Sequence, residues 1–334
     1  MILCSSASPS EVGTQQVDGI TVVRVDMNRI LNERDPGALL TARRTVSEVA
    51  RTFRPDVVHA HDVGPMAWLT RNARRQHPIP LITTVHTMLS IFTQGSSESP
   101  FLAELKAADR ITAVSQSVAD DITGLVPLLA AKLSVIPNGV MLSLPITPAS
   151  DAPHLAYVGR LVEGKRVDLV IEAVARLAGK YPALRLTIAG IGPCESSLRQ
   201  LAASLGITDR VDFVGLVARE HVPDILRRAS AVVLPSEVEG LPIVALETAC
   251  MGRPIVGTRS PGLADAVIDG ETGLLVEQGD LDGLTAALDD VLAHPERARA
   301  LGAAARARAE REFSLELCAD RYEALYERVV AQSP

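Results

Sequence analysis

Residues 154–174 read HLAYVGRLVEGKRVDLVIEAV, which divides into an apolar run, a loop and an amphipathic segment. The run at 154–158 lies between Pro153 and Gly159 and has the length of a buried strand. After the loop, apolar residues recur with helical spacing at Leu169, Val170, Ala173, Val174 and Leu177. This stretch therefore predicts a strand, a short loop and a helix.

The same alternation recurs along nearly the whole chain. Further short runs rich in β-branched residues lie at 20–25, 56–60, 80–85, 110–114, 132–136, 184–189, 210–214, 231–235 and 253–257. Continuous apolar strands suit a parallel sheet that is buried on both faces. Because strands and helices alternate, the sequence predicts an α/β fold with doubly wound sheets.

The length and one poorly patterned stretch indicate two domains. At roughly 150 residues per domain, 334 residues fit two. The proline-containing stretch 138–154 reads as a linker, so we expect one domain at 1–145, a second at 153–313 and a last amphipathic helix within 314–334. Two doubly wound domains would face one another across a cleft, which is the default ligand site.

Composition excludes several classes of function. A net charge of -7 and an aromatic content of 3% argue against a nucleic-acid partner. The longest uncharged stretch, 76–97, contains Pro78 and Pro80 and does not suit a membrane span. The cysteines are scattered at Cys4, Cys194, Cys250 and Cys318. That spacing predicts neither a zinc site nor a disulfide framework, and it fits a cytoplasmic protein.

Two cations follow the predicted strand at 154–158. Arg160 and Lys165 stand between the strand and the start of the helix, where backbone N–H groups and the helix dipole favour an anion. Lysine is scarce in this chain, which favours a need for a compact ammonium at Lys165. These residues are candidates for holding a diphosphate. The alternative is a solvated pair of cations near a helix start.

Two glutamates form the second candidate site, in PSEVEGLPIVALETACMGRP (235–254). Glu239 lies in a loop before a predicted helix, in whose first turn Pro242 fits. Glu247 lies inside the helix on an apolar face and calls for a partner. A carboxylate accepts two hydrogen bonds from a vicinal diol, such as a ribose or a hexose. The alternative is two unrelated surface glutamates.

Histidines follow two predicted strands. His86 in TVHTM (84–88) stands where ligands bind in open α/β sheets and is a candidate hydrogen-bond donor to a substrate oxygen; the alternative is a structural histidine. His59 and His61 have a spacing that could suit a metal, but no third ligand is evident, so we interpret them as structural. The turn GIGP (190–193) lacks the third glycine of a dinucleotide fingerprint, so an NAD-dependent oxidoreductase is disfavoured.

Taken together, the motifs resemble the family 4 glycosyltransferases. The matching segments are VGRL with Lys165, the GIGP turn, VDFVG (211–215), PS-x-x-EGLP-x-x-x-LE, the turn at Pro261–Gly262 with DGETGLLV (269–276), and upstream TVH, AVS and IPNGV. Their order and spacing cover most of residues 56–313. The resemblance implies the GT-B architecture of two Rossmann-like domains, with the final helix packing back toward the first.

The resemblance also implies an activity. It is the retaining, metal-independent transfer of a sugar from a nucleotide donor, UDP- or GDP-linked, to a hydroxyl acceptor that the sequence does not identify. No cofactor is implied. A peripheral membrane contact at the inner face is possible in the family, and residues 42–54 are the nearest candidate segment. A solvated helix face is the alternative interpretation of that segment.

Site residues follow from the resemblance by position. Arg160 and Lys165 would hold the donor diphosphate, and Glu247 the ribose hydroxyls. His86 would face the reacting centre. The donor sugar would meet Glu239, Gly240, Leu241 and Pro242, and the base would lie by Gly190, Ile191, Phe213, Val214 and Gly215.

Several positions depart from the family pattern. Met141 stands where an aspartate is common, Leu263 replaces the second glycine of a Gly-Gly turn, and Leu241–Pro242 replaces Phe-Gly. The family normally opens with a strand, a glycine-rich loop and a helix ahead of the strand that MILCSS matches, so we expect an incomplete N-terminal domain. A non-catalytic nucleotide-sugar-binding remnant or partner subunit is therefore the alternative to an active enzyme.

Overall fold

The computed structural model describes residues 1–6, 9–74, 79–94, 98–142 and 152–332. They form two compact units, which we treat one at a time. Unit 1 comprises Met1–Ala113, Asp121–Ser134 and Glu323–Pro334, and unit 2 comprises Val114–Asp120 and Val135–Tyr322. The greater part of the predicted linker, 143–151, lies outside the described residues.

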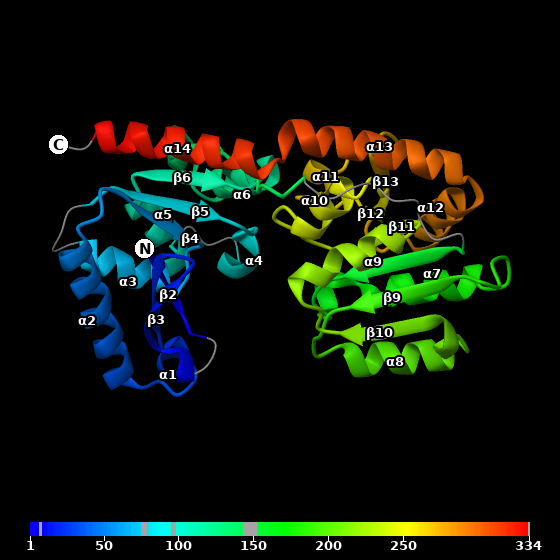
Figure 1. Ribbon diagram of the computed structural model, residues 1–334, viewed down its shortest axis with the longest axis horizontal. Helices are drawn as coiled ribbons and strands as arrows, with labels where there is room; N and C mark the ends of the chain where they lie inside the picture. Colours follow the sequence, from blue (N-terminus) through cyan, green and yellow to red (C-terminus); the bar gives the residue numbers. More distant parts are fainter. Residues whose placement is uncertain (7–8, 75–78, 95–97, 143–151, 333–334) are drawn as a thin grey trace. The chain divides into compact units, whose positions relative to one another are not determined.

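Unit 2 contains a parallel sheet of order β10-β9-β8-β11-β12-β13 (Figure 1). Its strands are β8 (His154–Val158), β9 (Arg185–Ala189), β10 (Val211–Gly215), β11 (Ala231–Leu234), β12 (Ile255–Thr258) and β13 (Gly273–Val276). The predicted strands of this region are confirmed, and β13 was not among them. Its sequence, GLLV, offers three apolar residues directly after the polar stretch DGET (269–272).

Helices cover both faces of this sheet. They are α7 (Val167–Leu177), α8 (Glu195–Ser204), α9 (Val222–Arg228), α10 (Ile243–Cys250), α11 (Leu263–Ala266), α12 (Leu281–Ala293) and α13 (Pro295–Glu312). The apolar stripe predicted for α7 is buried throughout and packs into the core of the unit with β8, β9 and α12. Asp280 caps α12 by accepting a hydrogen bond from the N–H of Gly283.

The strand order of unit 2 determines where a ligand can bind. The chain runs β8, β9, β10 outward in one direction and returns to β11 on the other side of β8. Loops that leave the carboxyl ends of β8 and β11 therefore diverge to opposite faces of the sheet and leave a crevice between them. The candidate residues Arg160 and Glu239 stand on these two loops.

The strands of unit 1 form two sheets, of orders β1-β3-β2 and β4-β5-β6-β7. Their bounds are β1 (Ile2–Ser5), β2 (Gly13–Val17), β3 (Ile20–Val25), β4 (Val58–His61), β5 (Leu81–Val85), β6 (Arg110–Ala113) and β7 (Leu133–Val135). The predicted strands of this half are confirmed except for β2, which was not predicted. Its exposed residues GTQQV carry no apolar pattern, and it pairs with β3 through a turn at Asp18 and Gly19, both with positive φ.

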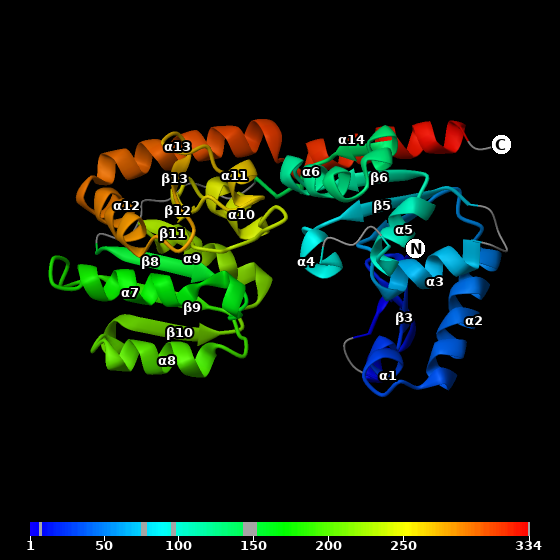
Figure 2. The same cartoon turned by 180° about the vertical axis from the view of Figure 1, so that it is seen from behind.

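The helices of the first half and of the chain end are α1 (Met27–Leu31), α2 (Pro36–Phe53), α3 (Pro65–Arg74), α4 (Ser90–Thr93), α5 (Pro100–Ala107), α6 (Gln116–Leu125) and α14 (Leu315–Ala331). Figure 2 shows α3 and α5 on the near side of unit 1. The part of α14 from Glu323 onward belongs to unit 1, where Tyr326 contacts His59. Across the described residues, no helix combines the length and the apolar character that crossing a membrane requires.

Candidate active site

The loop after β8 carries the two candidate cations. Gly159 and Arg160 follow the strand, and Lys165 ends a short 3-10 turn, Glu163–Lys165, before α7. Arg166 has a φ of 48°, so the chain turns sharply there and Lys165 lies ahead of the helix instead of in its first turn. Lys165 therefore lies between β8 and α7, beside the start of the helix, as the sequence predicts.

Lys165 contacts one of the two candidate glutamates. Its Nζ donates to Glu239 Oε1 at 2.5 Å, and the two side chains are 18% and 13% exposed. The residues lie 74 positions apart, on the loops after β8 and β11. The structure thus brings together two of the residues that the sequence analysis selected from separate motifs.

The buried phenol of Tyr157 interacts with both Arg160 and Glu239. Burial raises the pKa of the Tyr157 phenol, the charge of Glu239 raises it further and the charge of Arg160 opposes the rise. The phenol donates to the backbone carbonyl of Arg160 at 2.9 Å. The phenol thus interacts electrostatically with residues from two loops, those after β8 and β11.

The turn that follows β9, at Gly190, and the end of β10, at Gly215, lie at the same carboxyl edge of the sheet. Gly190 has a φ of 143°, and a Cβ there would lie 1.8 Å from the carbonyl oxygen of Gly159. Leu161 N–H donates to Ile191 O at 3.0 Å, and Gly190 N–H donates to Gly215 O at 2.8 Å. Only glycine permits this approach, which holds the GIGP turn against the loop of Arg160.

A second close contact fixes the loop after β11. Gly262, in the turn after β12, has a φ of 75°, and a Cβ there would lie 2.3 Å from Gly240 O and 2.4 Å from Glu239 O. Glu239 N–H donates to Pro261 O at 3.2 Å. The Pro261–Gly262 turn therefore supports the backbone that presents Glu239.

Two residues that the sequence analysis did not select orient the backbone next to Glu239. Ser115 Oγ donates to Gly240 O at 2.6 Å, and Asn138 Nδ2 donates to Leu241 O at 3.2 Å. These bonds engage both carbonyls and hold the backbone of Gly240 and Leu241 in place. Pro242, the residue before α10, has no N–H. The motifs AVS and IPNGV contain Ser115 and Asn138 and are the signal that could have identified them.

Glu247 lies inside α10, as predicted. Its side chain is half-buried; burial raises the pKa of its carboxyl group, and Arg219 partly offsets the rise. Among the described residues, the carboxylate has no hydrogen-bond partner in the protein. It is thus available to accept hydrogen bonds from a diol.

The residues expected beside the base differ in how exposed they are. Ile191 and Val214 expose 51% and 47% of their surface. The Phe213 ring packs against the core and lies under the guanidinium of Arg199, with Cζ 4.4 Å from the ring centroid. The ring of Phe213 is therefore occupied by contacts within the protein, whereas the side chains of Ile191 and Val214 are exposed enough to contact a ligand.

His86 belongs to unit 1, at the end of β5. Its Nε2 lies 2.9 Å from Nδ1 of His61, and its backbone N–H donates to Asp62 Oδ1 at 3.1 Å. Burial lowers the pKa of the His86 imidazole, His61 lowers it further and Asp62 opposes the shift. A neutral ring at pH 7 has one donor and one acceptor nitrogen, and the contact with His61 engages Nε2.

His59 has partners on both ring nitrogens, as a structural histidine should. Nδ1 lies 2.7 Å from Tyr326 Oη, and Nε2 lies 2.6 Å from Thr84 Oγ1. Burial, His61 and His86 lower its pKa to about 3. Within the part of the chain that the structure describes, no three His, Cys, Asp or Glu side chains converge as metal ligands would.

Comparison with known proteins identifies the family. Residues 1–144 match the family model described as Glycosyltransferase Family 4, and residues 145–308 match Glycosyl transferases group 1. A D-inositol 3-phosphate glycosyltransferase of Kribbella flavida is 33% identical, over 96% of this chain and 84% of that protein. The chain belongs to the family 4 glycosyltransferases.

Other relatives of this family 4 glycosyltransferase differ in activity. Glycogen synthase of Mycobacterium tuberculosis is 34% identical over 79% of this chain, a match that spans 66% of that enzyme's length. The structure of Anabaena HepE in complex with UDP-glucose superimposes with a TM-score of 0.78 at 20% identity, over 92% of this chain and 86% of that one. The expected GT-B fold of two Rossmann-like domains is confirmed.

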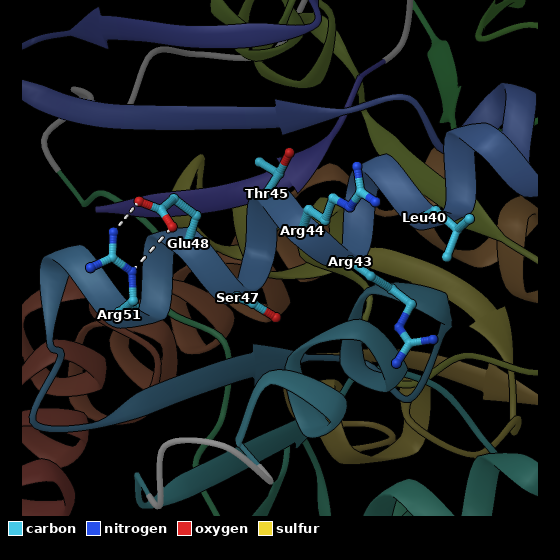
Figure 3. Close-up of a pocket in the computed structure, with 7 residues that line it drawn as sticks. All are labelled: Leu40, Arg43, Arg44, Thr45, Ser47, Glu48 and Arg51. Carbon is cyan, nitrogen blue, oxygen red and sulfur yellow. Dashed lines mark hydrogen bonds and ion pairs between the residues drawn. The ribbon is translucent and has the colours of Figure 1, made fainter.

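The structure of this glycosyltransferase also contains a hollow on α2 of unit 1 (Figure 3). Its volume is about 810 Å³, and its lining is Leu40, Arg43, Arg44, Thr45, Ser47, Glu48 and Arg51. Glu48 pairs with Arg51 at 2.5 Å, and Arg43 Cζ lies 6.0 Å from the Trp68 ring centroid. All lining residues come from one helix, so this surface lacks the convergence of separate loops seen in unit 2.

Proposed function

We propose that this chain transfers a sugar from a nucleoside-diphosphate donor to an acceptor hydroxyl, with retention of configuration at the anomeric carbon and without a metal or other cofactor. One observation carries the proposal: Lys165 and Glu239, from loops on either side of the switch point in the sheet, meet at its carboxyl edge. A donor bound there would lie at the crevice where open α/β sheets bind nucleotides.

The departure of the diphosphate gives a chemical reason for the two cations, Arg160 and Lys165. When the bond between the anomeric carbon and the diphosphate oxygen breaks, negative charge grows on that oxygen. Arg160 and Lys165 then interact more strongly with the transition state than with the bound donor, which is the condition for catalysis. The acceptor oxygen bonds to the anomeric carbon, and its proton leaves with the diphosphate.

The remaining residues of unit 2 bind the donor's other parts. Glu239 and the N–H groups of Gly240 and Leu241 meet the transferred sugar, with Pro242 shaping the loop. Glu247 accepts hydrogen bonds from the ribose hydroxyls, which suits its half-buried carboxylate without a protein partner. The base lies by the Gly190–Ile191 turn and the backbone of Phe213, Val214 and Gly215.

His86 acts in turnover, as a neutral imidazole. Because burial holds its pKa below the ordinary value, the ring is uncharged at pH 7 and donates through a neutral N–H. A neutral donor can hold a sugar or acceptor hydroxyl without adding a cation to the site.

The proposed donor is a UDP- or GDP-sugar. The solved relative HepE binds UDP-glucose, and another relative, from Mycolicibacterium smegmatis, is named a GDP-mannose-dependent mannosyltransferase. The acceptor is a saccharide, a lipid-linked sugar or another hydroxyl compound. We place the protein in the cytoplasm, with a peripheral contact at the inner membrane face through the arginines of α2 as a further proposal.

Thermal-shift titration of the purified chain tests donor binding. UDP-glucose, GDP-mannose and ADP-glucose are compared with NAD, each without and with EDTA. The proposal expects one nucleotide sugar to raise the melting temperature in a saturable way that EDTA leaves unchanged. A preference for NAD, or no shift with any nucleotide, would contradict it.

The alternative of a non-catalytic nucleotide-sugar-binding protein predicts the same thermal shift. Turnover distinguishes the two, since only an enzyme releases free nucleoside diphosphate from the bound donor with an acceptor present. The relatives named above carry the names of enzymes, which favours turnover.

A further inference from the structure

Two histidine rings of unit 1, those of His61 and His86, meet at the ends of neighbouring strands. β4 pairs with β5 in parallel, and His61 lies opposite Thr84. His86 follows β5 directly. Each histidine of β4 contacts the residue 25 positions further along the chain, so that His59 contacts Thr84 and His61 contacts His86. The register of the two strands thus places the His61 ring against the His86 ring.

The two rings meet edge to edge. Nδ1 of His61 and Nε2 of His86 are 2.9 Å apart, and the ring centroids are 5.2 Å apart. The difference of 2.3 Å matches two ring radii, so both nitrogens lie close to the line that joins the ring centres. The ring planes differ by 27°, which lets the lone pair of one nitrogen face the N–H of the other. The contact is therefore an N–H···N hydrogen bond.

This hydrogen bond couples the tautomers of the two rings. Burial lowers the pKa of His61 and of His86, and in both the charge of Asp62 opposes the shift, so both rings are neutral at pH 7. A neutral imidazole has one donor and one acceptor nitrogen. If His61 donates, His86 carries its proton on Nδ1; if His86 donates, its Nδ1 is an acceptor. The tautomer of His61 therefore decides what His86 offers to a ligand.

Nδ1 is the nitrogen of His86 that a ligand can use. Among the described residues, it has no hydrogen-bond partner, since the contact with His61 engages Nε2. His59 differs, because its two nitrogens contact Tyr326 Oη and Thr84 Oγ1. His59 thus fits the structural role that the sequence predicts, whereas His86 keeps one nitrogen open.

Asp62 favours a proton on that open nitrogen. Its Oδ1 accepts a hydrogen bond from the backbone N–H of His86 at 3.1 Å, and its own N–H donates to Thr84 O at 2.7 Å. Nδ1 is bonded to Cγ of the ring and so lies nearer to the backbone of His86 than Nε2 does. A carboxylate stabilises a proton on the nearer nitrogen. Nε2 of His86 is then the acceptor, and His61 is the donor.

We propose that His61 is a positioning residue for the sugar transfer: its Nδ1–H donates to Nε2 of His86, which places the proton of the His86 ring on Nδ1, where it donates to a sugar or acceptor hydroxyl. The inference rests on the proposed function, in which His86 acts as a neutral donor. It separates the role of His61 from that of His59, although the two histidines stand only two positions apart in HAHD.

Nitrogen NMR of the ligand-free protein tests the tautomers directly. Long-range proton–nitrogen spectra of the ¹⁵N-labelled full chain at pH 7 distinguish a ring nitrogen that carries a hydrogen from one that does not. The spectra of His86→Ala and His61→Leu assign the signals of the two rings. We expect a hydrogen on Nδ1 of His61 and on Nδ1 of His86. A hydrogen on Nε2 of His86 in the wild type would overturn the inference.

Two substitutions of His61 separate the hydrogen bond from packing. His61→Asn keeps an amide N–H near the place of Nδ1, whereas His61→Leu leaves only carbon there. We expect the wild-type tautomer of His86 in the Asn variant and a mixture of both tautomers in the Leu variant. His61→Ala replaces the Leu variant if that protein does not fold. An unchanged His86 tautomer without the His61 donor would show that His61 does not set it, and would overturn the inference.

Turnover links the tautomer to the reaction. With a responsive donor and acceptor, kcat should fall at least about tenfold in His61→Leu and stay within about threefold of the wild type in His61→Asn, while the donor KM changes by less than about twofold in both. Equal losses of kcat in the two variants would overturn the inference. Wild-type turnover in His86→Ala is a different result, because it would overturn the proposed function, and the inference with it, whatever tautomer the spectra show.

Discussion

At the scale of single residues, the candidate site is organised around charges that are already paired. Lys165 and Glu239 neutralise one another at 2.5 Å while both are largely buried. In the proposed function, a diphosphate that binds Lys165 would release Glu239 to accept hydrogen bonds from sugar hydroxyls. On this proposal, one ion pair would be exchanged for two ligand contacts, and binding of the diphosphate would be coupled to binding of the sugar.

This coupling predicts that Lys165→Ala weakens binding of the cognate nucleoside diphosphate by at least tenfold, about 1.4 kcal/mol. The substitution removes a cation and leaves Glu239 as an unpaired negative charge facing the diphosphate. Isothermal titration calorimetry measures the effect. The matched control is Lys180→Ala, which removes an exposed lysine of the same unit that pairs with Asp289 at 2.6 Å. Equal affinity in the two variants would refute the role of Lys165.

The burial of Glu247 should lower the stability of the folded protein at neutral pH, although the same carboxylate is proposed to bind the donor. Its carboxyl pKa in the folded protein lies above the ordinary value of 4.5, so the folded state binds a proton more tightly than the unfolded state. Stability is therefore greatest when the group is protonated and declines as pH rises from 4.5 through the raised pKa. Glu247→Gln should remove this decline, so its melting temperature relative to the wild type rises between pH 4 and pH 7.

The same variant should bind the donor at least tenfold more weakly, because an amide replaces one of the two acceptor oxygens with a donor. Thermal melts at pH 4 and pH 7 together with calorimetric affinities check both statements. A variant that matches the wild type in stability at both values of pH, or one that binds donor normally, would count against this account of Glu247.

At the scale of elements, the site depends on loops that touch through glycine. The turn after β9 lies against the loop after β8 because Gly190 has no Cβ to meet the carbonyl of Gly159. The turn after β12 supports the loop after β11 in the same way through Gly262. Two pairs of loops are thereby fixed at one edge of the sheet, the edge at which we propose that the donor binds.

Gly190→Ala should therefore destabilise unit 2 and weaken donor binding together. A Cβ 1.8 Å from a backbone oxygen, at a φ of 143°, forces the turn to move, and backbone strain of this kind costs about 1–3 kcal/mol. Gly179→Ala is the control, since nothing lies within 4 Å of its Cβ and its φ is not in the left-handed range. Scanning calorimetry should show a lower unfolding temperature for the first variant alone.

Much of this element-level order could be predicted from the sequence. Apolar runs of four to six residues located most strands, because parallel strands that are buried on both faces must be apolar throughout. β2 was missed, since its polar residues GTQQV depend on the turn at Asp18–Gly19. The contact of Lys165 with Glu239 joins positions 74 apart, and no local pattern encodes such a distance. Likewise the contact of His61 with His86 follows from strand register and not from the spacing in HAHD.

At the scale of the whole molecule, the proposed roles divide between the units. The residues proposed to bind the donor belong to unit 2, from Arg160 to Glu247, together with Ser115 and Asn138, which orient its backbone. His86 belongs to unit 1, where it follows β5. The sheet that contains β5 is separate from the sheet whose loops carry the residues proposed to bind the donor. This division predicts that binding and turnover can be separated by substitution.

His86→Ala should lower kcat by about 100-fold or more, a loss typical of removing a positioned proton-transfer or hydrogen-bonding group. The affinity for the nucleoside diphosphate should stay within about twofold of the wild type, because unit 2 supplies those contacts. Steady-state kinetics with a responsive donor and acceptor, paired with calorimetry on the diphosphate, measure the two quantities. His294→Ala is the matched control, as an exposed histidine of unit 2 remote from the selected motifs. If His86→Ala weakened diphosphate binding as much as it slowed turnover, the division of roles between the units would be wrong.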